Sequence, residues 1–77
     1  MDKRLIEILE EIKPDVDFEE CTTLIDEHYL DSLSLVALIA ELEEEYDITI
    51  PTVDVVPDNF NSAGNMWLMI LRLQEDY

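Results

Sequence analysis

Apolar residues recur at intervals of three and four along most of this chain, and no other feature limits its fold as strongly. Such spacing places apolar side chains on one face of an α-helix, whereas a half-buried strand needs strict alternation. Only one glycine and three prolines interrupt the 77 residues, and alternating β-branched residues are nearly absent. The pattern therefore predicts an all-α protein.

The first two helices have clear start and stop signals. A helix over about residues 2–13 ends where Pro14 restricts the backbone of Lys13. Its apolar positions are Leu5, Ile8, Leu9 and Ile12. The best-defined helix begins after Asp31, whose carboxylate can accept hydrogen bonds from the first free backbone amides, and ends near Asp47. Its inward-facing stripe is Leu35, Leu38, Ile39, Leu42 and Tyr46.

The rest of the chain predicts a long loop and two further helices. Residues 15–31 contain scattered apolar residues without helical spacing, and a loop of this length usually has a function. Pro57 can start a short turn of helix. Asn61 or Ser62 can cap a last helix over about residues 63–75. The inward positions of that helix are Met66, Met69, Ile70 and Leu73. We therefore expect a small antiparallel bundle of three main helices plus one short helix.

Length and charge narrow the class of function. A chain of 77 residues has room for one core, so we expect residues 1–77 to form a single domain without a deep catalytic cavity. Twenty acidic residues against four Lys and Arg give a net charge of −16, which disfavours nucleic acids and anionic lipids and favours basic protein partners. The 48% apolar content indicates a folded chain and not an acidic disordered tail.

The sequence lacks the features of membrane-spanning, exported, disulfide-bonded and metal-binding proteins. No apolar run approaches the roughly 20 residues that span a bilayer, and the N-terminal segment lacks a signal peptide's apolar stretch. We therefore expect a cytoplasmic protein without stable membrane insertion. Cys21 is a single cysteine and cannot form an internal disulfide. Cys21 and His28 together supply too few ligands for a zinc site, and neither has an orienting partner for nucleophilic catalysis. A calcium loop starting at Asp15 is excluded because Glu20 stands where glycine is needed, so we expect no metal.

The helix that follows Asp31 has a second apolar face. Its members, also spaced by three or four residues, are Leu33, Val36, Ala37 and Ala40. They lie on a different face from the inward-facing stripe. Either this second face docks an external protein, or the helix is central and buried on nearly all sides.

A motif centred on Ser32 lies between the long loop and this helix. The residues that carry it, with the pattern that follows, are Leu30-Asp31-Ser32-Leu33, Val36, Leu38-Ile39, Leu42-Glu43-Glu44-Glu45-Tyr46 and Ile50-Pro51. Together with the segment from Pro57 to Leu73, in which Phe60 precedes Asn61-Ser62, they resemble the acyl carrier protein family over nearly the whole chain. The resemblance is to stand-alone carriers that depend on phosphopantetheine.

The resemblance implies that Ser32 carries phosphopantetheine through a phosphodiester, installed from coenzyme A by a carrier transferase that uses magnesium. A hydroxyl at a helix N-terminus suits this chemistry, because free amides and the helix dipole accommodate a phosphate. Asp31 would cap the helix and help orient the transferase's magnesium, and Leu33 completes the motif at the attachment site.

The implied function is that of a carrier and not of an enzyme. The thiol of the arm would hold an acyl or aminoacyl group as a thioester. A monomeric carrier would take this group from an adenylating acyl ligase or acyltransferase to a downstream synthase or acyl acceptor enzyme. Its docking face, apolar at the centre and acidic at the edge, would consist of Leu33, Val36, Ala37, Ala40, Glu41 and Glu44.

Some positions depart from the family pattern. Ser34 and Ala37 stand where carriers of fatty acid synthesis tend to have acids, and Glu27-His28-Tyr29-Leu30 stands where many carriers have a glycine. Leu30-Asp31-Ser32 is similar to D-alanyl carriers, although Asn61-Ser62-Ala63 is not their typical ending. Two alternatives stay open: a D-alanyl or other aminoacyl carrier for cell-envelope or specialised biosynthesis, and an acidic helical adaptor without a prosthetic group.

Overall fold

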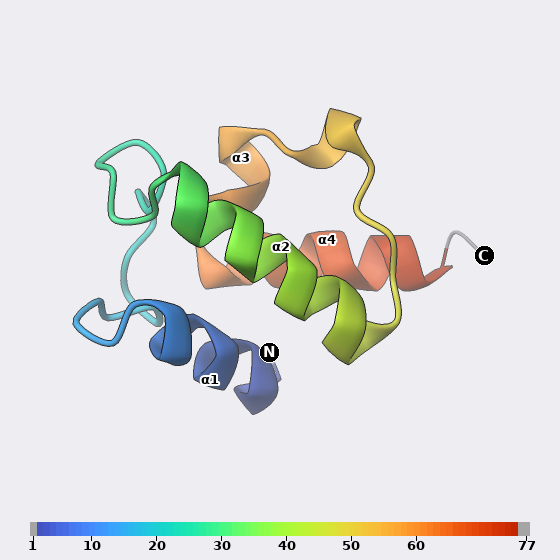
Figure 1. Ribbon diagram of the computed structural model, residues 1–77, viewed down its shortest axis with the longest axis horizontal. Helices are drawn as coiled ribbons and strands as arrows, with labels where there is room; N and C mark the ends of the chain where they lie inside the picture. Colours follow the sequence, from blue (N-terminus) through green and yellow to red (C-terminus); the bar gives the residue numbers. More distant parts are fainter. Residues whose placement is uncertain (1, 76–77) are drawn as a thin grey trace.

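The computed structural model describes residues 2–75 and contains helices but no strand in that range. Its elements are α1 (Lys3–Ile12), α2 (Ser32–Tyr46), the 3-10 helix η1 (Thr52–Asp54), α3 (Pro57–Phe60) and α4 (Ala63–Glu75). The expected all-α bundle of three main helices and one short helix is confirmed. α1 and α2 run in opposite directions, and α4 starts at the same end of the molecule as α2 (Figure 1). None of the helices between residues 2 and 75 combines the length and the apolar character that a membrane span requires.

α1 begins and ends where the sequence predicts. The side chain of Asp2 accepts a hydrogen bond from the backbone N–H of Arg4 at 3.0 Å, which makes Asp2 the N-cap. At the other end, the N–H of Lys13 donates to the carbonyl of Leu9 at 2.9 Å. The predicted span of residues 2–13 therefore equals α1 plus its two caps.

α2 ends at Tyr46 and is closed by its C-cap, Asp47, as predicted. Asp47 adopts a left-handed conformation with φ of 52°, which aspartate tolerates better than most residues. The N–H groups of Asp47 and Ile48 both donate to the carbonyl of Glu43. The Glu43 side chain in turn accepts a hydrogen bond from the N–H of Ile50 at 2.9 Å. The segment that leaves α2 is thus fixed to the last turn of the helix.

The core takes only a narrow stripe of α2. Leu38 and Leu42 are fully buried, whereas Leu35, Ile39 and Tyr46 of the predicted inward stripe are only partly buried against the core. The core consists of Leu5, Ile8, Leu9, Phe18, Leu24, Leu30, Leu38, Leu42, Ile48, Ile50, Phe60, Ala63, Met66, Met69, Ile70 and Leu73. All four inward positions predicted for α4 are among them.

The long loop between α1 and α2 is attached to this core. Phe18, Leu24 and Leu30 are 3%, 0% and 4% exposed. Fully burying a side chain of this size contributes about 1.5–3 kcal/mol. The loop therefore follows a fixed course although it contains no regular helix.

Polar contacts close the end of the molecule where α1 begins and α2 ends. The guanidinium of Arg4 pairs with Glu45 of α2. The hydroxyl of Tyr46 donates to Asp2 at 3.3 Å, and its ring meets Trp67 of α4 edge to face, with centroids 5.8 Å apart. Burial raises the pKa of Tyr46 to about 12, and the Asp2 carboxylate adds to the shift. The phenol therefore keeps its proton at neutral pH and remains a donor.

Candidate functional site

Ser32 is the first residue of α2 and is exposed to solvent. The residue before it, Asp31, has an extended backbone, and its Oδ1 accepts a hydrogen bond from the N–H of Ser34 at 2.8 Å. The carbonyl of Asp31 accepts from the N–H of Leu35 at 2.9 Å and so begins the helical ladder. Asp31 is therefore the N-cap, as predicted. The hydroxyl of Ser32 lies at the partially positive end of a helix.

Asp31 is held in its charged form by this geometry. Hydrogen bonds from the backbone and the side chain of Ser34 keep the pKa of Asp31 below its ordinary value, and the charge of Lys13 contributes less. Because the folded pKa is lowered, the stabilisation that this carboxylate gives α2 is present at neutral pH. It is lost as the pH falls through the folded pKa.

The segment that leads to Ser32 forms a closed turn between two buried leucines. The N–H of Leu30 donates to the carbonyl of Leu24 at 3.0 Å, and the N–H of His28 donates to the carbonyl of Ile25 at 3.0 Å. His28 has a φ of 62°, a left-handed conformation that costs a residue with a Cβ about 1–2 kcal/mol. It lies within Glu27-His28-Tyr29-Leu30, where many acyl carriers have glycine. The turn keeps the geometry that glycine favours without having one.

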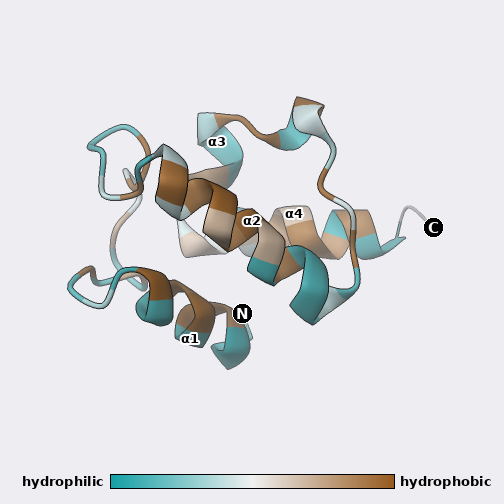
Figure 2. Cartoon of the chain, viewed as in Figure 1, coloured by the Kyte–Doolittle hydropathy of each residue, from teal (hydrophilic) through white to brown (hydrophobic). Residues whose placement is uncertain are grey.

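The second apolar face of α2 is open to solvent. Leu33 is 83% exposed and Val36 is 66% exposed. The other exposed members of the predicted docking face are Ala37, Ala40, Glu41 and Glu44. Figure 2 shows hydrophobic residues along the first turns of α2 and hydrophilic residues at its C-terminal end. The alternative in which α2 is buried on nearly all sides is therefore wrong.

A small apolar hollow lies on another side of α2. Its volume is about 190 Å³, and it is lined by Ile25, Leu35, Val55, Val56, Pro57 and Phe60. Leu35 follows Ser32 by three residues, which is about one helical turn. No pattern in the sequence indicates this hollow, because its walls come from four segments: the long loop, α2, the segment before α3, and α3 itself.

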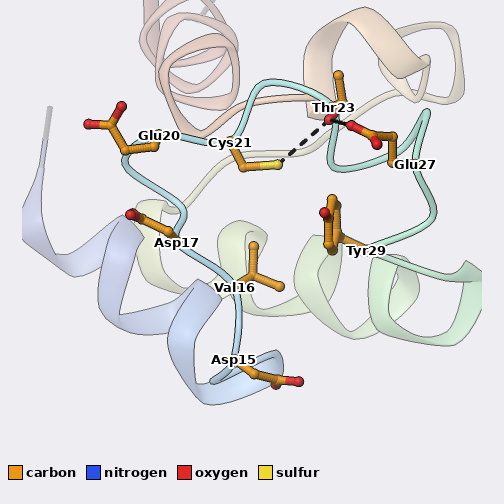
Figure 3. Close-up of a pocket in the computed structure, with 8 residues that line it drawn as sticks. All are labelled: Asp15, Val16, Asp17, Glu20, Cys21, Thr23, Glu27 and Tyr29. Carbon is orange, nitrogen blue, oxygen red and sulfur yellow. Dashed lines mark hydrogen bonds between the residues drawn. The ribbon is translucent and has the colours of Figure 1, made fainter.

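A larger hollow, with four acidic residues in its lining, lies beside the long loop (Figure 3). Its volume is about 360 Å³, and it is lined by Asp15, Val16, Asp17, Glu20, Cys21, Thr23, Glu27 and Tyr29. The thiol of Cys21 lies 3.8 Å from the hydroxyl of Thr23, which donates to Glu27. His28 does not line the hollow, so Cys21 has no histidine beside it there. In residues 2–75, no three His, Cys, Asp or Glu side chains converge to hold a metal ion.

The structure assigns different tasks to the two residues predicted as alternative caps of α4. Ser62 is the cap, because its Oγ accepts a hydrogen bond from the N–H of Asn65 at 3.0 Å. Asn61 is buried instead, and its side-chain oxygen accepts from the N–H groups of Ile25 and Asp26 in the long loop. Sequence spacing could not reveal this pairing, since the partners are 36 and 35 residues apart.

The structure is a small helical bundle with an exposed serine at the start of a partly acidic, solvent-facing helix. Residues 3–66 match the family model described as the phosphopantetheine attachment site. The chain belongs to this family of carrier proteins, whose covalent prosthetic group is phosphopantetheine. An exposed hydroxyl at a helix N-terminus fits a phosphodiester link to that group. The alternative of an acidic adaptor without a prosthetic group is thereby set aside.

The chain is also similar to several curated proteins named D-alanyl carrier proteins. That of Streptococcus sanguinis is 38% identical over 63 residues, covering 80% of each chain. That of Listeria welshimeri is 38% identical over 60 residues, covering 75% of this chain and 77% of its own. That of Streptococcus mutans is 42% identical over 43 residues, covering 56% of this chain and 54% of its own. Membership of a carrier family implies transferase and loading enzymes as partners in general.

We expect His28→Gly to raise the free energy of unfolding by about 1 kcal/mol, because glycine adopts a positive φ without a clash from Cβ. Chemical denaturation followed by circular dichroism measures this change. His28→Ala, which keeps the Cβ, is the matched control and should bring no gain. Equal stabilisation by both substitutions would show that the imidazole, and not the backbone conformation, is unfavourable.

Proposed function

We propose that phosphopantetheine is attached to Ser32. The observation that supports this most is the exposure of Ser32 as the first residue of α2, directly after its charged N-cap. In the transfer, Oγ of Ser32 loses its proton and bonds to the phosphorus that carries pantetheine in coenzyme A. The bond from that phosphorus to the bridging oxygen breaks, and adenosine bisphosphate leaves. The helix dipole at this position stabilises the phosphodiester that remains.

The chain's own contribution is to present the arm and not to catalyse. A transferase supplies the catalytic groups and magnesium, with Asp31 beside the acceptor hydroxyl and Leu33 as its apolar neighbour. The thiol at the end of the arm then takes an acyl or aminoacyl group from an adenylating ligase or acyltransferase and gives it to a downstream synthase or acceptor. Residues 1–77 act in this cycle as a single, monomeric carrier domain in the cytoplasm.

Partner enzymes dock on the exposed face of α2 in this proposal. Leu33 and Val36 form its apolar centre, and Glu41 and Glu44 lie toward the acidic end of the helix, with Ala37 and Ala40 between. Interfaces of this kind combine an apolar core with a polar rim. The net charge of −16 speeds the encounter with a partner that carries a basic surface.

Ser32→Ala should abolish modification completely, because alanine has no hydroxyl to accept the phosphopantetheine group. Intact-mass spectrometry after incubation with coenzyme A, magnesium and a broad-specificity carrier transferase measures the result. Ser34→Ala is the matched control and should still gain one arm, since Ser34 is only half-exposed and lies on another side of α2. A wild-type chain that stays unmodified, or an arm that persists in Ser32→Ala, contradicts the proposed attachment site.

We propose D-alanine as the cargo, because two curated relatives that match three quarters or more of this chain are named D-alanyl carrier proteins. The modified protein should gain one alanyl group in the presence of ATP, D-alanine and a D-alanine-activating ligase. Hydroxylamine should remove the group, as it cleaves thioesters. L-alanine and short fatty acids with their own activating ligases are the comparisons, and preferential loading by one of these would replace D-alanine as the cargo.

Leu33→Ser should raise the KM of the transferase about tenfold, because loss of a central apolar contact costs more than about 1 kcal/mol of binding. Steady-state kinetics with the carrier as the varied substrate measures the change. Leu68→Ser is the matched control, since Leu68 is an exposed leucine of α4, 65% exposed, that lies outside the docking face. Similar KM values for the two variants would contradict docking through α2.

A further inference from the structure

Asn61 is joined to the long loop by several hydrogen bonds that no motif in the sequence indicates. Its Oδ1 accepts hydrogen bonds from the N–H of Ile25 at 3.0 Å and from the N–H of Asp26 at 3.1 Å. Its Nδ2 donates to the carboxylate of Asp26 at 3.2 Å, and its carbonyl accepts from the N–H of Leu24 at 3.0 Å. Four hydrogen bonds thus join one buried residue to three consecutive loop residues.

The backbone of Asn61 is itself held in place. Its N–H donates to the carbonyl of Pro57 at 2.8 Å, so Asn61 terminates α3. The next residue, Ser62, caps α4. The side chain of Asn61 is therefore presented from the junction of two helices, and only 8% of the residue is exposed. Such a residue can fix the position of a loop that lacks regular structure of its own.

The loop segment that Asn61 holds is the one that leads to Ser32. Leu24, Ile25 and Asp26 begin the turn that the hydrogen bond from Leu30 to Leu24 closes, and Leu30 directly precedes the cap of α2. Released from Asn61, the N–H groups of Ile25 and Asp26 would need water as their acceptor, and the turn would open. The position of the N-terminal turn of α2 therefore depends on a residue that lies far from it in sequence.

We infer that Asn61 is a positioning residue for the modification of Ser32: by anchoring residues 24–26 to the α3–α4 junction, it sets the geometry in which a transferase meets the serine. This inference rests on the proposed attachment at Ser32. Group transfer is sensitive to displacement of the reacting atoms by about 1 Å, with losses on the order of 100-fold in the strongest cases. Asn61 acts through the loop and does not touch the reacting groups.

The first test compares Asn61→Ala with Asn59→Ala. Asn59 is the control, because it is a neighbouring asparagine whose side chain makes its hydrogen bond, from Nδ2 to the carbonyl of Asp54 at 2.8 Å, to a different segment. Asn61→Ala should lower kcat/KM for transfer from coenzyme A at least about fivefold. Asn59→Ala should leave it unchanged at a temperature where both variants are folded by circular dichroism.

Hydrogen exchange on the unmodified proteins supplies a readout that does not depend on the transferase. In Asn61→Ala, the amides of Ile25, Asp26 and Leu30 should exchange about tenfold faster, as expected when local bonds that hold the turn are lost. Amides in the middle of α2 should keep their protection. In Asn59→Ala, the three loop amides should stay protected.

A pair of substitutions tests the geometry even if Asn61→Ala unfolds the chain. Asn61→Asp keeps the acceptor for the two loop amides but places a carboxylate against the carboxylate of Asp26, so kcat/KM should fall. Adding Asp26→Asn restores a donor and acceptor pair with the roles exchanged, and kcat/KM should return to within about twofold of the wild type. A structural defect unrelated to this pair would not be rescued.

The results separate this inference from the proposed function. If the wild-type chain is not modified at Ser32, both the attachment site and the role of Asn61 in it are overturned. If the wild type is modified and Asn61→Ala reacts as fast as Asn59→Ala, only the inference about Asn61 is overturned. That inference is likewise overturned if Asn61→Asp reacts normally or if Asp26→Asn fails to rescue it.

Discussion

The limited burial of α2 is the constraint on which the rest of this structure depends. Only Leu38 and Leu42 of this helix are buried, so one narrow stripe joins it to the core. Leu35, Ile39 and Tyr46 are partly buried beside that stripe, and the face that contains Leu33 and Val36 is left to solvent. A helix buried on all sides would have had no free N-terminus to offer a partner. The same packing that stabilises the bundle thus leaves both Ser32 and its apolar neighbours accessible.

Few cationic side chains are present to neutralise the acidic residues, four Lys and Arg against 20 Asp and Glu. Arg4 joins the start of α1 to Glu45 at the end of α2, and Arg72 of α4 pairs with Asp54 of η1. Both pairs connect segments that are distant in sequence. Most carboxylates remain solvated instead, which keeps the surface acidic toward basic partners.

The position at which α2 starts is fixed both by its N-cap and by the loop that precedes it. On the side of the helix, the charged carboxylate of the N-cap Asp31 accepts a hydrogen bond from the N–H of Ser34. On the side of the loop, the burial of Leu24 and Leu30 and the hydrogen bonds of Asn61 hold the approaching chain. A loop without regular structure can present a serine reproducibly when apolar anchors and a buried amide fix its course. The left-handed His28 shows that this course is maintained even at some cost in backbone energy.

The sequence by itself determined the elements that depend on local chemistry. Apolar spacing placed the main helices, Pro14 and Asp47 ended two of them, and the position of Asp31 identified the cap beside Ser32. These features could be read because helix periodicity and capping involve residues within about one turn of each other. The resemblance in the same stretch indicated the carrier family that the comparison of residues 3–66 shows.

Only the tertiary structure decided that the second apolar face of α2 is exposed, because the sequence pattern allowed either an open face or a helix buried on nearly all sides. It also decided between Asn61 and Ser62, since the loop partners of Asn61 are 35 and 36 residues away in sequence. The hollow beside Leu35 and the left-handed conformation of His28 were likewise decided by the tertiary structure. Each arises from the way the long loop is folded onto the core, and no local sequence pattern encodes a contact between segments so far apart.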